Sequence, residues 1–476
     1  MEWIRQDKET IAALATPVGE GGVGIVRISG PMTRSILDKI FVPHRASVSW
    51  KSHQLVFGRC IDEEGEWLDE VLAVWMAEGR SYTGEDVVEI HGHGGQLNMT
   101  ELLRRALQEG ARLAQAGEFT RRAFLNGRID LTRAEAIADM INAKNEQALR
   151  IARHHLQGKL QEWLDELSEK SLQLAAQVES WIDFPEEFDP ALDQAVATLI
   201  DDIHQFRDKV RSLCDSYQQG QRFREGWSLV LLGRPNAGKS SLFNHLSGKD
   251  RAIVTHVPGT TRDLLDTQIA LGGIQLTLTD SAGLRDTPEA SLASADENDE
   301  GQLHSAIEKI GVSRALEAAE ESHLILAVFD RSRPWSQEDD KVLAACEGKP
   351  AVLVLNKSDL PHQLEVTSFQ DFDSLHTIEI SCSSGEGIDT LREWLQSYTE
   401  QQTPSNEMVI TNERQYQALQ KALNALNHAL LQGYELGPEF MAEDLREARK
   451  HLSHITGRVS TEDILDALFS RFCIGK

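Results

Sequence analysis

The sequence predicts a multidomain protein of mixed α/β and α class. Residues 1–120 combine short alternating apolar runs with glycine-containing turns, which is typical of an α+β domain. Residues 121–220 and 405–476 carry apolar side chains at helical spacing, whereas residues 221–404 alternate strand-like and helix-like runs. We therefore expect a discontinuous helical domain with an α/β domain inserted between its two segments.

The composition is that of a globular protein and restricts its partners. Of 476 residues, 41% are hydrophobic and 26% are charged, and the formal net charge is −27. Such acidity repels nucleic acid at long range, so RNA contact would need a local basic patch or a partner. The charged N-terminus and the lack of an apolar run of roughly 20 residues favour a cytoplasmic protein without a membrane segment.

The cysteines and histidines do not suggest a structural metal or a disulfide framework. The cysteines are odd in number and none are spaced as a metal-binding pair: Cys60, Cys214, Cys346, Cys382 and Cys473. We interpret His91-Gly92-His93, the closest histidine pair, as a glycine-rich turn.

In the N-terminal domain, alternation predicts strands at 24–28, 70–75 and 87–90, followed by a helix over 97–110. In the helical segment, Leu156, Leu160, Leu164 and Leu167 continue an amphipathic stripe at spacings of three and four. Pro185 interrupts the helix, which resumes to about residue 217.

The inserted domain reads as a parallel sheet with crossover helices. Its predicted strands are 228–232, 276–279, 323–329, 351–355 and 377–380. The polar, acidic stretch 285–304 predicts a mobile loop.

The strongest motif, Gly233-Arg-Pro-Asn-Ala-Gly-Lys-Ser240, matches the phosphate-binding P-loop and follows an apolar strand. Lys239 would contact the β- and γ-phosphates, and the Ser240 hydroxyl would bind Mg²⁺. The other nucleotide-binding residues expected here are Asn236, Ala237, Gly238 and Ser241.

Two further segments would complete the phosphate site. Asp280 can hold Mg²⁺ through water, and the Gly283 amide can contact the γ-phosphate. We assign Thr261 to the Mg²⁺ shell and to γ-phosphate sensing. Leu284 stands where Ras-like enzymes carry the glutamine that orients water, so hydrolysis would be slow or use another group.

A third motif, Asn356-Lys-Ser-Asp359, predicts guanine specificity. Asp359 can accept two hydrogen bonds from guanine that adenine cannot donate. Asn356 would join the loops, the Lys357 stem would cover the base, and the backbone amides of Ser381, Cys382 and Ser383 would face the guanine oxygen. These motifs together predict an inserted Ras-like P-loop GTPase domain.

Along essentially its whole length, the sequence resembles the tRNA modification GTPase family MnmE, also called TrmE. The resemblance is carried by motifs in one order: Ala15-Thr-Pro-Val-Gly19, Gly21-Gly-Val-Gly-Ile25, Arg27-Ile-Ser-Gly30, Tyr82-Thr-Gly-Glu-Asp86, Gly92-His-Gly-Gly95, Gly117-Glu-Phe-Thr120, Arg122-Ala-Phe-Leu-Asn-Gly127, Ala134-Glu-Ala136 and Phe472-Cys-Ile-Gly-Lys476.

The resemblance implies a potassium-stimulated GTPase. Asn236 would ligate K⁺, with further oxygens from Thr255, Val257 and Thr260, and Glu308 would position the attacking water. The catalytic residues would thus be Lys239, Thr261, Glu308 and Cys473, and Cys473 would lie near the folate. The sequence departs from the family at His256 and Pro258 and in the longer acidic stretch 285–304.

The resemblance also implies a tetrahydrofolate-binding-like N-terminal domain that forms a homodimer. Glu89 would bind the pterin of a 5-formyl or 5,10-methylene derivative, and Arg27, Arg128 and Lys476 would line the site. Glu20 replaces the family's usual basic residue.

The implied function is modification of tRNA wobble uridine at carbon 5, by aminomethyl or carboxymethylaminomethyl addition. A flavoprotein partner, MnmG, would complete a heterotetramer and make most of the tRNA contact. The residues leave open a regulatory GTP-binding switch, such as a ribosome-assembly factor, and a non-catalytic structural dimer.

Overall fold

The computed structural model describes residues 9–17, 19–45, 49–143, 145–184, 194–249, 266–271, 274–280, 319–320, 322–364, 376–401, 408–458, 462–470 and 472–476. The chain forms two compact units. One comprises Met1–Ile141, Ala152–Arg211 and Gln417–Lys476, and the other comprises Asn142–Ile151 and Ser212–Tyr416. Because these limits fall inside helices, the domain boundaries at 120, 220 and 404 stay a proposal.

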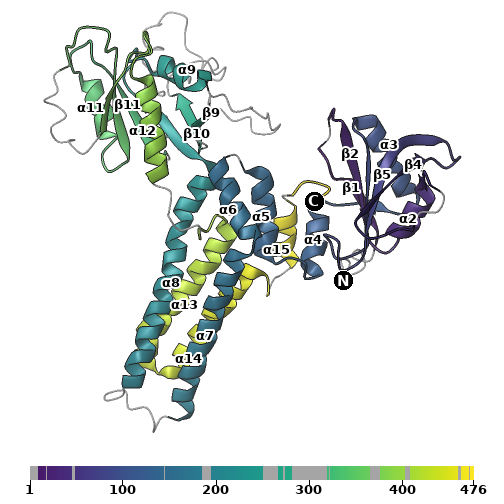
Figure 1. The fold of residues 1–476 in the computed structure, drawn as a ribbon. Helices are drawn as coiled ribbons and strands as arrows, with labels where there is room; N and C mark the ends of the chain where they lie inside the picture. Colours follow the sequence, from purple (N-terminus) through teal and green to yellow (C-terminus); the bar gives the residue numbers. More distant parts are fainter. Residues whose placement is uncertain are drawn as a thin grey trace, which may run out of the picture. The chain divides into compact units, whose positions relative to one another are not determined.

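The described residues of the N-terminal part form a mixed sheet with helices α2 and α3, which confirms the α+β prediction (Figure 1). Its elements are β1 (Ile11–Leu14), β2 (Val23–Ser29), α2 (Thr33–Ile40), β3 (Phe41–Pro43), β4 (Gln54–Ile61), β5 (Trp67–Met76), β6 (Val87–His93), α3 (Gln96–Gln108) and β7 (Arg112–Leu113). The strand order is β3-β4-β5-β6-β2-β1-β7, and only β1 and β7 pair in parallel.

The turn predicted at His91-Gly92-His93 is wrong, because these residues end strand β6 and pair with β2. Gly92 is needed there for packing rather than for a turn. A Cβ on Gly92 would lie 2.6 Å from a carboxylate oxygen of Asp69 and 2.9 Å from Leu102. The glycine therefore lets α3 pack closely on the sheet.

The helical part contains α4 (Glu118–Leu125), α5 (Leu131–Asn142), α6 (Glu146–Leu156), α7 (Lys159–Asp183), α8 (Gln194–Glu225), α13 (Glu413–Leu436), α14 (Pro438–Thr456) and α15 (Glu462–Phe469). In α7, Leu160, Leu164 and Leu167 are buried, as the predicted stripe requires. Helix α7 packs along α14, and the buried Ser171 hydroxyl donates to the carbonyl of Leu445 at 3.1 Å. The predicted interruption at Pro185 lies outside the described residues.

Helix α8 runs longer than predicted and leads almost directly into the inserted domain. Only Gly226, with φ +93°, separates it from the first strand. The last turns of α8 also contact the segment that leaves the inserted domain. The Ser216 hydroxyl accepts from the Ile410 amide at 3.1 Å. Arg224 donates to the carbonyl of Thr411 at 3.2 Å. The two ends of the insert therefore lie side by side, as an inserted domain requires.

The inserted domain is a sheet of order β13-β12-β11-β8-β10-β9 with flanking helices. Its elements are β8 (Trp227–Leu232), α9 (Lys239–Lys249), β9 (Asp266–Leu271), β10 (Ile274–Asp280), β11 (Leu324–Asp330), α11 (Gln337–Ala344), β12 (Ala351–Asn356), β13 (His376–Glu379) and α12 (Ile388–Gln401). The parallel pairing is confirmed except at β9, which pairs antiparallel with β10. Only two residues join β9 to β10, too few for a crossover.

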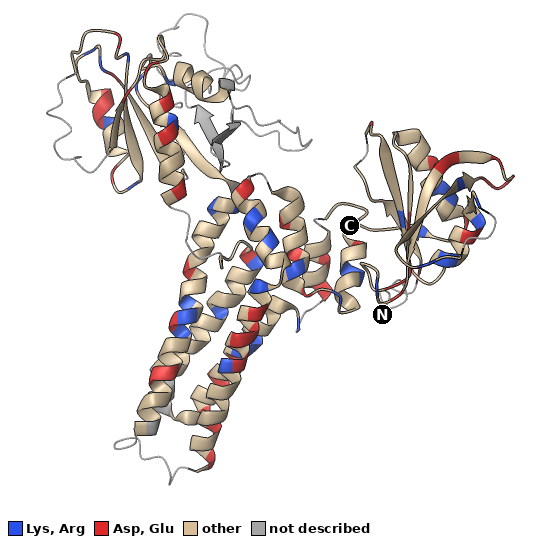
Figure 2. Cartoon of the chain, viewed as in Figure 1, with Lys and Arg blue, Asp and Glu red and all other residues tan. Residues whose placement is uncertain are grey.

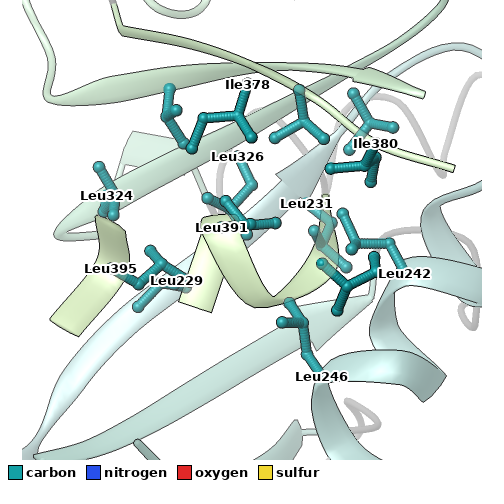
Figure 3. Close-up of a cluster of buried hydrophobic side chains, with 14 of the residues drawn as sticks. Leu229, Leu231, Leu242, Leu246, Leu324, Leu326, Ile378, Ile380, Leu391 and Leu395 are labelled. Atoms are coloured by element: carbon teal, nitrogen blue, oxygen red, sulfur yellow. The ribbon is translucent and has the colours of Figure 1, made fainter. Parts of the chain in front are cut away.

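Both faces of strands β8, β11 and β12 are buried, which explains their continuous apolar sequences. Leu229 and Leu231 of β8 face α9 and α12, where they meet Leu242 and Leu391 (Figure 3). The alternate residues of β8 belong to a second apolar cluster that includes Leu343 of α11. Helices on both faces fix the strand ends that carry the polar loops.

None of the helices in the described ranges is long and apolar enough to cross a membrane.

Candidate functional site

The P-loop connects the end of β8 to the start of α9, so its amides lie at a helix N-terminus. Asn236 and Gly238 both have positive φ, 64° and 101°. Asparagine tolerates this conformation better than most residues with a Cβ. At Gly238 a Cβ would overlap the side-chain amide of Asn356, so the motif glycine is required by close packing.

Lys239 is the buried cation of this loop, with 8% exposure. Its ammonium donates to the carbonyl of Gly233 at 2.6 Å and to that of Arg234 at 3.1 Å. Ser240 follows it in the first turn of α9 and is exposed. The lysine and the positive end of the helix thus suit a phosphate, whereas the serine hydroxyl offers an oxygen of the kind that Mg²⁺ prefers.

Asn356, 1% exposed, connects three loops. Its side-chain nitrogen donates to the carbonyl of Ala237 at 2.8 Å. Its side-chain oxygen accepts from the amides of Lys357 at 2.8 Å and Cys382 at 3.2 Å. One buried amide therefore fixes the P-loop against both segments predicted to hold guanine, as expected for residues that act as a unit.

Asp359 lies beside the Ser381–Ser383 loop. Its carboxylate accepts from the Ser381 hydroxyl at 2.6 Å, and that hydroxyl is 2.9 Å from the Ser383 hydroxyl. Hydrogen bonds from Ser381 and Ser383 lower the pKa of Asp359, which keeps it ionised as an acceptor. Burial raises the pKa of the Cys382 thiol to about 11, which disfavours its thiolate form at neutral pH.

The remaining predicted nucleotide-site residues are placed only in part. Asp280 is the last residue of β10 and pairs with Leu231 of β8, which puts its backbone at the P-loop end of the sheet. Ser241 lies in the first turn of α9 and is exposed. The others lie outside the described residues: Thr255, Val257, Thr260, Thr261, Gly283 and Glu308. The assignment of every Mg²⁺ and K⁺ ligand, including Ser240 and Asn236, therefore stays a prediction.

Sequence reasoning missed two ion pairs at this site. Asp330, at the end of β11, accepts from the Lys357 ammonium at 2.6 Å. Arg234 of the P-loop pairs with the buried Asp339 at 3.1 Å. A polar residue at the carboxyl end of an apolar strand was the available signal for Asp330, because ligand sites gather at such strand ends.

A second polar site lies in the N-terminal part. Arg27 of β2 pairs with Glu89 of the neighbouring strand β6 at 2.8 Å, and both side chains are 16% exposed. A hydrogen bond from His91, then the nearby Arg27, hold the pKa of Glu89 below its ordinary value against the effect of burial. An ionised, half-buried carboxylate suits a ligand with paired N–H donors.

The C-terminal tail contacts this site. Arg27 donates to the carbonyl of Gly475 at 3.1 Å, and Ile474 forms a β-bridge with Ala116. Cys473 is exposed, and the amide of Lys476 donates to its carbonyl at 3.3 Å. The structure thus brings together Arg27, Glu89 and residues 473–476.

Arg128 belongs to the same part of the chain. It donates to the carbonyl of Gly79 at 3.0 Å, at the start of the loop that carries Tyr82. The Arg27 guanidinium lies 5.9 Å from the Tyr82 ring centroid, within cation–π range. The loop from Gly79 is therefore the link between Arg128 and the Arg27–Glu89 pair.

Basic helix residues that could have contacted RNA are mostly neutralised. Figure 2 shows acidic and basic residues interspersed along the described helices. The pairs are Arg121–Asp466, Arg122–Glu85, Arg122–Glu118, Arg133–Asp130, Arg446–Glu179 and Lys450–Glu447. These pairings argue against a continuous basic patch on the described helices.

Comparisons with known proteins cover nearly the whole chain. Residues 10–128 match the family model "GTP-binding protein TrmE N-terminus", and residues 131–473 match "MnmE helical domain". The tRNA modification GTPase MnmE of Geobacter sulfurreducens is 41% identical over 98% of this chain and 99% of its own. That of Synechococcus sp. (strain JA-3-3Ab) is 39% identical over 98% of each chain. With two matching family models and relatives of this identity over nearly full length, the chain belongs to the MnmE family of tRNA modification GTPases.

Proposed function

We propose that the inserted domain binds GTP and hydrolyses it to GDP and phosphate in the course of tRNA modification. The observation that carries this proposal is the position of Asn356, which ties the P-loop to the two segments around Asp359. The Asp359 carboxylate would select guanine, because adenine lacks the paired N–H donors from which this carboxylate would accept.

Nucleotide selectivity tests this proposal directly. The purified protein should bind GDP at least about 100-fold more tightly than ADP. Asp359→Asn should lose GDP and gain affinity for XDP, whose base presents an acceptor where guanine has a donor. Equal binding of GDP and ADP by the unaltered protein would exclude a guanine site.

We propose further that hydrolysis depends on Mg²⁺ and K⁺. Ser240 supplies a hydroxyl oxygen, the kind of ligand that Mg²⁺ prefers. Asn236 would offer its side-chain oxygen to K⁺, joined by Thr255, Val257 and Thr260. Lys239 would stabilise charge on the phosphates, Thr261 would complete the Mg²⁺ shell, and Glu308 would orient the attacking water in place of the glutamine that Leu284 replaces.

For the N-terminal site we propose a tetrahydrofolate derivative, 5-formyl or 5,10-methylene. The ionised Glu89, held by Arg27 and His91, fits the adjacent N–H donors of a pterin. Arg128 and Lys476 would attract the acidic tail of the ligand. Bound folate would supply a one-carbon unit, and Cys473 lies in the tail that reaches this site.

Binding of 5-formyltetrahydrofolate checks this second site. Glu89→Gln should weaken binding by at least about tenfold, because a charge-assisted acceptor is lost. Glu70→Gln is the matched control, since Glu70 pairs with the exposed Arg59 on the same sheet. A folate affinity unchanged by Glu89→Gln would place the ligand elsewhere, and no folate binding at all would favour a GTP-binding switch such as a ribosome-assembly factor.

In the full proposal, a homodimer of this chain works in the cytoplasm with a flavoprotein partner, MnmG, in a heterotetramer. Together they would add an aminomethyl or carboxymethylaminomethyl group to carbon 5 of the wobble uridine. The net charge of −27 and the paired basic residues support a division of labour in which the partner makes most of the tRNA contact.

A further inference from the structure

Asp330 carries a buried carboxylate to which nothing above assigns a role in the reaction. Its side chain is 1% exposed, and one oxygen accepts from the amide and hydroxyl of Ser332 at 3.0 and 2.6 Å. The other oxygen lies 2.6 Å from the Lys357 ammonium. Although burial alone raises it, hydrogen bonds from Lys357 and Ser332 hold the pKa of Asp330 below its ordinary value. An ionised group buried in this way needs its partner, since removal of one charge leaves the other uncompensated.

Lys357 is the nearer of two cationic partners, since the Arg333 guanidinium lies 3.7 Å from the same carboxylate oxygen, and Lys357 stands within the guanine motif. Its backbone has φ +67°, an uncommon value for a residue with a long side chain. An unrestrained lysine samples many rotamers, and ordering it on nucleotide binding would cost conformational entropy. The pair with Asp330 restricts the Lys357 side chain before any ligand arrives.

The segment 330–339, here called the clamp segment, also contacts the P-loop. It joins β11 to α11 (Figure 1). Arg234 donates to the backbone carbonyl of Asp330 at 3.3 Å and to the carboxylate of Asp339 at 3.1 Å. The clamp segment also contacts the guanine loop, because the Arg331 amide donates to the carbonyl of Asn356 at 3.1 Å. One short segment therefore contacts both the phosphate loop and the guanine loop.

From these contacts we infer that Asp330 is a positioning residue of the nucleotide site. It holds the Lys357 side chain along the edge of the guanine site, while the clamp segment joins the two loops into one preformed unit. A preformed site retains nucleotide longer, because less side-chain freedom is lost on binding. The inference rests on the proposed binding of guanine nucleotide and adds a residue that acts through Lys357.

The test measures the affinity and dissociation rate of a fluorescent GDP analogue with the full-length protein. Asp330→Asn keeps the size of the side chain and removes its charge, so it should raise the dissociation constant about tenfold, mainly through faster release. Asp389→Asn, which removes an exposed carboxylate from α12, should change neither quantity.

A double-mutant cycle separates positioning from general support of the fold. In a Lys357→Met background, Asp330→Asn should add less than about twofold, because the group through which it acts is already gone. A full tenfold addition in that background would overturn the inference, and so would an affinity for GDP unchanged by Asp330→Asn alone.

The remaining controls keep the test decisive. If Asp330→Asn does not fold, Asp330→Ser takes its place in the cycle, since serine stays polar but is too short to reach the Lys357 ammonium. If the unaltered protein binds no GDP analogue, the proposed function fails, whereas normal binding by both proteins rejects only the role of Asp330.

Discussion

At the scale of single residues, His323 links pH to stability. Its Nδ1 accepts from the Ser228 amide at 3.0 Å, so the ring must be neutral at that nitrogen. Burial, and then the nearby Arg222, lower the pKa of His323 from 6.5 to about 4. His323 therefore takes up a proton near pH 6.5 in the unfolded chain but only near pH 4 in the folded chain.

We predict that this histidine makes the free energy of unfolding fall as pH drops from about 6.5 towards 4, by on the order of 2 kcal/mol. His323→Asn keeps an oxygen acceptor for the Ser228 amide and does not titrate in that range. Urea unfolding of both proteins across this range measures the difference. A constant gap between the two proteins would contradict a pH-linked role for His323.

Single residues also show where sequence reasoning stops. The motif predicted that Asn356 joins loops, and the structure places its amide between Ala237 and Cys382. Asp330 was missed because a lone aspartate after a strand has no motif around it, and its partner Lys357 lies on another strand end. Partners separated by 27 positions are brought together only by the fold.

At the scale of elements, helix propensity and close packing favour different residues at one position in the last turns of α8. Gly220 lies within the helix, where alanine is ordinarily favoured by about 1 kcal/mol. A Cβ there, however, would overlap the backbone carbonyl of Ile410, which is fully buried. A clash with backbone is not relieved by a rotamer change and costs about 1–3 kcal/mol.

We therefore predict that Gly220→Ala lowers the melting temperature, against its helix propensity. Gln218→Ala, an exposed substitution in the same helix, is the control and should leave the melting temperature within about 2 °C. A melting temperature raised by Gly220→Ala would show that the contact between α8 and residues 409–411 yields easily.

Elements were predicted where the hydrophobic pattern is unambiguous. The strands of the inserted sheet and the stripe of α7 followed from periodicity alone. The antiparallel strand β9 was missed because its short polar–apolar pattern does not indicate that it pairs with β10. Strand β6 was cut short at His91 because glycine next to histidine suggested a turn, whereas close packing against Asp69 and Leu102 explains Gly92.

At the scale of the whole molecule, the order of parts follows from the sequence, since two helical segments enclose a P-loop domain. The contacts of α8 with residues 409–411 explain how the insertion is accommodated. The Arg27–Glu89 pair and the P-loop belong to separate compact units, so the ligand proposed for each can be tested on its own.

The most direct test of the account is GTP hydrolysis in KCl and in NaCl at equal ionic strength, with an Asn236→Gly variant beside the unaltered protein. Glycine removes the Asn236 side chain while keeping its positive φ without strain, so any loss reports on the side chain. We predict turnover of GTP and not ATP, faster in KCl, with the potassium gain abolished in Asn236→Gly. Equal rates in the two salts would contradict the cation site at Asn236, and no turnover of GTP in either salt would contradict the GTPase itself.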